Sequence, residues 1–204
     1  MTTIAFTTRE LRDLAIAWLA LGLAFTFFLN RSLAFAFFAD PRPSTAGQFA
    51  GGFTLSLLTV GVGFLLHEVA HKVVAIRFGQ IAEFHADYGM LGLAVASGLA
   101  GFLFAAPGAV HHRGMITKRE NALIAIAGPI TNLLLVICFL PLTLLSGYLG
   151  TVGGLGVTIN LLLAAFNLLP FGPLDGKKVL TWSPFVFAVV FVPVLLLTVA
   201  RFLW

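Results

Sequence analysis

The stretch GFLLHEVAHKVVAI, at residues 63–76, places two histidines, a glutamate and a lysine inside an otherwise apolar run. On an α-helix, positions i and i+4 lie on the same face, so His67 and His71 can approach one ligand together. Ionisable side chains are costly at membrane depth, and there they usually mark a functional site. The stretch therefore predicts a membrane helix that carries a ligand-binding or reactive site.

His67-Glu68-Val69-Ala70-His71 is an HExxH motif, in which two imidazoles bind zinc and the glutamate is the general base. Zinc lowers the pKa of its water toward ~7 and so supplies a nucleophile at neutral pH. The plainer interpretation is a polar helix end that reaches the membrane surface. Such an end calls for Lys or Arg rather than this triplet, so the motif favours hydrolytic chemistry with one zinc ion per chain.

A catalytic zinc site needs a third protein ligand and an open position. The candidates are Glu83, His85, Asp87, His111, His112, Glu120 and Asp175. Asp175 follows a Gly/Pro-rich break after an apolar span, and irregular backbone at membrane depth occurs where it lines a cavity. An Asp before Gly176 is also typical of an ordinary turn. The residues alone leave the third ligand open.

The composition points to a membrane protein. Of the 204 residues, 59% are hydrophobic and 10% are charged, whereas a soluble domain carries about a quarter charged residues. The net charge of +4 fits cationic membrane loops better than nucleic acid, so no nucleic-acid partner is expected. Cys138 is the one cysteine, which excludes an intramolecular disulfide and a cysteine zinc cluster.

Five apolar stretches are long enough to cross a ~30 Å hydrocarbon core, which needs about 20 residues. They cover residues 14–38, 49–76, 121–145, 152–170 and 184–204. The shorter, glycine-containing segment Met90–Ala106 can be a short span, a re-entrant hairpin or an interfacial helix, and the alternation over residues 80–88 predicts a short strand. The expected fold is an all-α integral membrane protein, with one domain over residues 1–204 and its core at 53–178.

Three segments resemble, in order, the signature regions of the site-2 protease family of intramembrane zinc metalloproteases. They are HEVAH at residues 67–71, AGPITN at 127–132, and NLLP at 167–170 leading into LDG at 174–176. The segment Pro107–Val110 also resembles the short glycine-bearing loop of that family. The resemblance covers about residues 53–178 and is to the compact type without a PDZ-like insertion.

The resemblance implies roles for particular residues. His67, His71 and Asp175 would bind the zinc ion, and Glu68 would be the catalytic base. It further suggests that Asn132 and Asn167 hold the substrate backbone.

These implied ligands predict a topology. The ends of the spans at 49–76 and 152–170 must meet, so the two run in the same direction and the span at 121–145 runs back between them. Met90–Ala106 must then start and end on one side of the membrane. Most Lys and Arg residues share that side, and the positive-inside rule places it, the N-terminus and the opening of the zinc site in the cytoplasm.

The function expected from these observations is an endopeptidase that cuts transmembrane segments of membrane proteins in the lipid bilayer. A membrane metal transporter using the same His/Asp cluster is the alternative, and the broken helix near Asp175 fits it. However, the chain has no internal repeat, and Glu68 between the histidines favours hydrolysis. A silent scaffold is disfavoured because all four catalytic residue types are present. The sequence indicates no particular oligomeric state.

Overall fold

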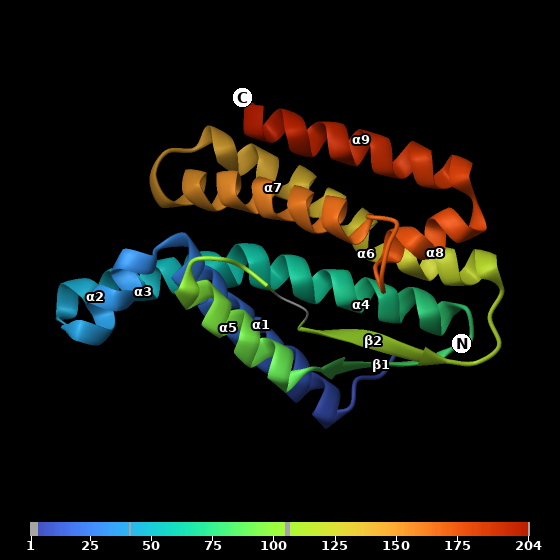
Figure 1. Cartoon of the computed structure of the whole chain (residues 1–204), viewed down its shortest axis with the longest axis horizontal. Helices are drawn as coiled ribbons and strands as arrows, with labels where there is room; N and C mark the ends of the chain where they lie inside the picture. The colour runs from blue at the N-terminus through green and yellow to red at the C-terminus, as the bar shows by residue number, and fades with distance from the viewer. Residues whose placement is uncertain (1–3, 41, 105–106, 204) are drawn as a thin grey trace. The chain divides into compact units, whose positions relative to one another are not determined.

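The computed structural model describes residues 4–40, 42–104 and 107–203 (Figure 1). Helices form most of it, and two short strands pair in one sheet. The expected all-α fold with a minor strand component is confirmed. The elements in chain order are α1 (Thr8–Leu29), α2 (Arg31–Ala39), α3 (Pro43–Ser56), the π-helical η1 (Leu57–Gly61), α4 (Val62–Arg77), β1 (Ile81–Ala86), α5 (Tyr88–Ala100), β2 (Gly108–Arg113), α6 (Lys118–Phe139), the 3-10 helix η2 (Leu140–Leu144), α7 (Gly147–Asn167), α8 (Asp175–Trp182) and α9 (Pro184–Leu203).

Among the described residues, five helical stretches are long and apolar enough to cross a membrane, so the chain is a multi-pass membrane protein. They are Thr8–Leu29, Pro43–Arg77, Lys118–Leu144, Gly147–Asn167 and Pro184–Leu203. The predicted span at 14–38 is wrong in its extent. Asn30 ends α1, and its side chain accepts a hydrogen bond from Leu33 N (3.2 Å), which starts the separate helix α2. An N-cap of this kind favours a break in the helix.

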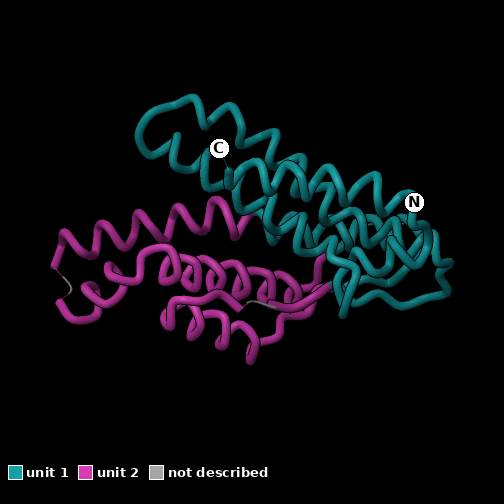
Figure 2. The backbone as a smooth tube through the Cα atoms, turned by 45° about the horizontal axis from the view of Figure 1, so that its top comes forward, with its two compact units in different colours: residues 1–5, 63–83, 110–204 teal, residues 6–62, 84–109 magenta. Residues whose placement is uncertain are grey.

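The chain forms two compact units, drawn in different colours in Figure 2. The first unit comprises the described residues within 1–5, 63–83 and 110–204, and the second those within 6–62 and 84–109. The boundary between the units falls after Val62, just past the end of η1 in the chain, within the Pro43–Arg77 helix. It also falls within both strands.

In the second unit, two carboxylates of α1 bind the backbone of the chain around β1. Glu10 Oε1 accepts from Phe84 N at 3.1 Å, and Asp13 Oδ2 accepts from Ala86 N at 3.4 Å. Tyr88 donates its hydroxyl to Asp13 Oδ1 at 2.5 Å. Buried carboxylates are costly unless such donors satisfy them. These bonds explain why the first turns of an apolar helix carry two acids.

The segment that contains α5 leaves and returns at one point. The backbone N–H of Asp87 donates to Pro107 O at 3.1 Å, and Phe104 N donates to Ser97 Oγ at 3.1 Å, which holds the returning chain against the helix. The 13 residues of α5 reach only about 20 Å, less than a ~30 Å hydrocarbon core. This geometry agrees with a segment that starts and ends on one side; its predicted end, Ala106, lies outside the described residues.

The strand expected within residues 80–88 is confirmed as β1. The second strand, β2, which contains His111 and His112, was not expected. The pairing is antiparallel, because Asp87 bonds Pro107 at one end while Gln80 Nε2 donates to Met115 O (3.0 Å) at the other. The residues of β2 have no strong strand propensity of their own, so pairing with β1 decides their conformation.

In the first unit, α6 packs against α7 and α8, and α9 contacts both α7 and α8. A capping box starts α6: Thr117 Oγ1 accepts from Glu120 N at 3.2 Å, and Glu120 accepts from Thr117 N at 2.8 Å. After α7 the chain returns so closely that a Cβ on Gly176 would lie 1.9 Å from Leu168 O. Only glycine fits there, and the close return places Asp175 at the start of α8.

Cysteine labelling from the two sides of the membrane tests the position of the α5 segment. In a Cys138→Ala background, we expect Ile81→Cys and Met115→Cys to react from the same side, since the chain between them returns to its starting point. Both side chains are well exposed, at 79% and 100%. Ser146→Cys, across one span from Met115, is the control and should react from the opposite side. Labelling of Ile81→Cys and Met115→Cys from opposite sides would contradict a re-entrant or interfacial segment.

Candidate metal centre

Three side chains from two helices meet in the first unit. His67 and His71 lie one turn apart on α4, with ring centroids 4.6 Å apart, and both are buried. Figure 1 shows the chain between α7 and α8 running toward α4. Asp175 Oδ2 lies 3.1 Å from His71 Nε2 and 3.5 Å from His67 Nε2. Ligand atoms of the three residues all lie within 4.8 Å of one another, so the group can hold a metal ion.

The partners of the two Nδ1 atoms set the imidazole tautomers. His71 Nδ1 lies 2.7 Å from Ile124 O, a carbonyl that can only accept, so Nδ1 must carry the proton. His67 Nδ1 lies 2.6 Å from Asn132 Oδ1. The Asn132 amide is oriented in turn, because its Nδ2 donates to Gly63 O at 3.2 Å. In the neutral rings, both Nε2 atoms therefore present a lone pair toward Asp175.

Two imidazole lone pairs and a carboxylate oxygen that face one another repel unless a cation lies among them. Imidazole nitrogen and carboxylate oxygen are zinc ligands, and three protein ligands with an open position are typical of catalytic zinc sites. Ligating histidines commonly donate their other N–H to a carbonyl or carboxylate, as His71 does to Ile124. The donor set and its surroundings therefore fit zinc.

The second oxygen of Asp175 contacts a lysine. Lys178 Nζ donates to Asp175 Oδ1 at 3.2 Å, which leaves Oδ2 directed at the histidines. Burial opposes ionisation of Asp175, whereas the positive charge of Lys178 favours it and lowers the pKa of the carboxyl group. A carboxyl group must be ionised to bind a metal.

Glu68, between the two histidines, is also buried. Its Oε2 accepts from the backbone N–H of Val110 at 3.1 Å, so strand β2 holds the carboxylate in place. From the sequence, Pro107–Val110 only resembled a glycine-bearing loop of the family. In the structure, Val110 of this segment contacts Glu68. In the part of the chain that the structure describes, the other candidate third ligands do not join the metal-binding group. They are Glu83, His85, Asp87, His111, His112 and Glu120.

Comparison with known proteins identifies the family. No family model matches the chain, and no solved structure matches it. It is 38% identical over 200 residues to the "Putative zinc metalloprotease MJ0611" of Methanocaldococcus jannaschii, covering 96% of this chain and 95% of that protein. The chain belongs to the site-2 protease family. Relatives with similar names are YwhC of Bacillus subtilis, 33% identical over 61% of this chain and 66% of that protein, and Rip3 of Mycobacterium tuberculosis, 34% identical over 69% of this chain and 35% of that protein.

In this site-2 protease family member, Asn132 contacts the Nδ1 side of His67. It is fully buried, and its amide is engaged by His67, Gly63 and Asn160. Asn160 Nδ2 donates to Gly156 O at 2.8 Å, so a chain of oriented amides runs from α7 through α6 to His67. Contact of Asn132 with substrate would require its amide to leave these partners. Asn167, at the end of α7, is half-buried and donates to Leu163 O at 2.9 Å.

Sequence reasoning missed Asn160. Its position in the middle of the apolar span at 152–170 could have indicated a role, because an amide there is costly unless it is hydrogen-bonded. The sequence does not show that the partner of this amide is Asn132.

The site also depends on an absent side chain. A Cβ on Gly128 of α6 would lie 2.4 Å from His67 Nε2 and 2.5 Å from His71 Nε2. In the sequence, Gly128 stands out only as part of a family motif. In the structure its missing side chain leaves the space in which the two Nε2 atoms face Asp175.

Replacing Asn132 tests the orienting role of its amide. We expect Asn132→Leu to weaken zinc affinity about 10- to 100-fold, which is typical when a residue that orients a metal ligand is lost. The affinity is measured by competition with a chelator of known zinc affinity. Thr131→Val is the matched control, because the Thr131 hydroxyl donates to Ala127 O within its own helix and, among the described residues, has no bond to the site. Equal zinc affinity in Asn132→Leu and the wild-type protein would contradict the role.

Proposed function

We propose that this chain is an intramembrane zinc endopeptidase that hydrolyses peptide bonds in transmembrane segments of membrane proteins. One zinc ion would be held by His67, His71 and Asp175, and Glu68 would be the catalytic base. The observation that carries the proposal is the convergence of two oriented Nε2 lone pairs on a carboxyl group, next to a buried glutamate. The family of the chain supports the same chemistry.

Each residue has a part in the proposed reaction. Zinc, when bound, supplies Lewis acidity that lowers the pKa of water and polarises the peptide carbonyl. Glu68 takes the proton from the attacking water as its oxygen bonds to the carbonyl carbon, and passes that proton to the amide nitrogen as the C–N bond breaks. The Val110 N–H holds the Glu68 carboxylate in position. Asn132 and Ile124 keep the two histidines in the tautomer that faces the metal.

The location of the motif supports a substrate within the membrane. His71 precedes Arg77 by six residues on a candidate span, which places it about 9 Å along the helix from the charged end. Water must reach this depth through a polar path, which we propose opens to the cytoplasm on the cation-rich side. A transmembrane substrate helix has its amides paired and must unwind locally before cleavage. We propose that Asn167 contacts the unwound backbone.

The metal-transport alternative has less support. Transport would need the His/Asp group but gives no role to a glutamate held between the ligands by a backbone N–H. The relatives are named as metalloproteases rather than transporters.

Cleavage by the purified protein tests the proposed function. In nanodiscs, a substrate with one transmembrane helix should be cut within or close to that helix, cleavage should stop with 1,10-phenanthroline, and zinc should restore it. A protein whose cleavage survives removal of the metal, or which cuts only soluble peptides, would not be the proposed enzyme.

Removal of Asp175 tests the third ligand. We expect Asp175→Ala to lose most of its zinc, because two histidines alone leave the site one ligand short. Zinc content is measured by elemental analysis after dialysis against a weak chelator. Asp40→Ala is the control, since Asp40 pairs with Arg42 at the surface and not with the site. Full zinc occupancy in Asp175→Ala would remove Asp175 from the ligand set.

A further inference from the structure

Each side chain of the metal-binding group has a second partner, on the atom that does not face the other two side chains. The two histidines use their Nδ1 atoms, which lie 2.6 Å from Asn132 Oδ1 and 2.7 Å from Ile124 O. The third partner is Lys178, whose Nζ donates to Asp175 Oδ1 at 3.2 Å. Groups that orient metal ligands in this way commonly influence metal affinity or activity. Lys178 is therefore a candidate for an orienting role.

The Lys178 contact differs from the other two in charge and exposure. An amide and a backbone carbonyl orient the histidines, whereas Lys178 carries a positive charge. Its side chain is 39% exposed, against 9% for that of Asp175. A partly exposed ion pair between residues i and i+3 of one helix adds little to stability. Loss of the pair should therefore leave the fold intact, so that a change at the site would report the orientation of the carboxylate.

Rotation of its carboxylate is the main freedom left to Asp175. The residue begins α8, and a Cβ on the next residue, Gly176, would lie 1.9 Å from Leu168 O, so the backbone is closely packed here. A carboxylate can bind a metal ion through one oxygen or through both. The Lys178 ammonium competes for Oδ1, because charge-assisted hydrogen bonds are roughly twice as strong as neutral ones.

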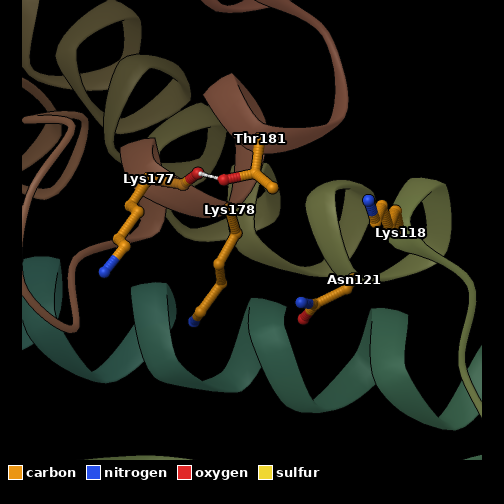
Figure 3. A pocket seen from close by; sticks show the side chains of 5 residues that line it. All are labelled: Lys118, Asn121, Lys177, Lys178 and Thr181. Carbon is orange, nitrogen blue, oxygen red and sulfur yellow. Dashed lines mark hydrogen bonds between the residues drawn. The ribbon is translucent and has the colours of Figure 1, made fainter.

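The neighbouring lysine does not share this contact. Figure 3 shows the side chains of Lys177 and Lys178 leaving α8 with their ammonium groups apart, and Lys178 extends on the side of α4, the helix of the two histidines. Lys177 is exposed and, among the described residues, forms no ion pair. The two lysines thus carry the same charge on the same helix, but Lys178 is the one that donates to Asp175.

We propose that Lys178 is a positioning residue, which keeps Asp175 Oδ1 occupied so that a bound metal ion receives Oδ2 alone. A catalytic zinc site has three protein ligands and an open position. A second carboxylate oxygen on the metal would take the position that water needs. The inference rests on the proposed zinc site, and it adds the residue that keeps this site open.

Cobalt substitution tests the role of Lys178 without a substrate. The zinc of the full-length protein in detergent is replaced by Co²⁺, whose visible absorption is strong in a tetrahedral site and weaker when a further ligand joins. We expect strong absorption from the wild-type protein and weaker absorption from Lys178→Met at equal cobalt content, because the methionine has no donor for Oδ1. Its kcat/KM with zinc should fall about 10- to 100-fold. Lys178→Arg keeps the charge and the donors and should absorb like the wild-type protein.

Lys177→Met is the matched control, since it removes the same charge one residue away, and its absorption and kcat/KM should match those of the wild-type protein. Circular dichroism verifies that each variant is folded. Wild-type absorption in Lys178→Met, an equal change in Lys177→Met, or loss of cobalt from folded Lys178→Met overturns the proposal and leaves the metal centre in place. Failure of the wild-type protein to bind cobalt would instead refute the metal centre itself, and the role of Lys178 with it.

Discussion

Glu68→Gln protein is expected to keep its zinc and to cleave substrate about 10²- to 10⁴-fold more slowly, the usual contribution of a general base. The amide is nearly isosteric with the carboxylate, so packing around the site should persist. The glutamine amide, however, cannot take a proton from the attacking water. The two measurements are zinc content, by elemental analysis, and kcat/KM with a transmembrane substrate in nanodiscs.

Loss of turnover with zinc retained separates a chemical role from a structural one. Glu83→Gln is the control, because Glu83 lies on β1 and outside the metal-binding group, so its kcat/KM should stay close to that of the wild-type protein. Near wild-type cleavage by Glu68→Gln would exclude Glu68 as the base. Loss of zinc in Glu68→Gln would instead indicate that the carboxylate holds the metal.

Gly128→Ala is expected to abolish zinc binding and, with it, all cleavage. The new methyl would lie 2.4 Å from His67 Nε2 and 2.5 Å from His71 Nε2, whereas ordinary contact begins at 3.4 Å. The histidines would have to move by about 1 Å, which is incompatible with metal–ligand distances held within about 0.2 Å. Helix propensity acts the other way, since Ala stabilises a helix interior by about 1 kcal/mol over Gly.

The opposed effects make Gly128→Ala a sharp test. The protein should remain folded, with its helical circular dichroism kept, while zinc affinity falls by orders of magnitude. Gly154→Ala is the matched control, because a Cβ there meets only Arg201 Nη2 at 3.9 Å, and it should bind zinc like the wild-type protein. Wild-type zinc affinity in Gly128→Ala would show that the metal does not lie among His67, His71 and Asp175.

Local patterns determined the membrane architecture. Each span is a run of apolar residues. Unpaired backbone N–H and C=O groups are costly in lipid, and a helix pairs all of them within a single segment, so such a run forms a helix. The sequence therefore predicted the five spans and the helical face shared by His67 and His71. It extended the first span past Asn30 to residue 38, because one polar residue can either continue or cap a helix and its neighbours decide which.

Only the tertiary structure decided which distant residues surround the motif. Among seven candidate third ligands, the return of the chain after α7 brings Asp175 to the histidines, 3.1 Å from His71 Nε2; its role as a ligand stays a prediction until zinc is measured. Asn160 and Gly128 acquire their importance in the same way. By itself, the sequence determined the spans, the reactive motif and the family resemblance, since these depend on neighbouring residues. The tautomers and the space for a metal depend on contacts between helices, which no periodicity within one helix specifies.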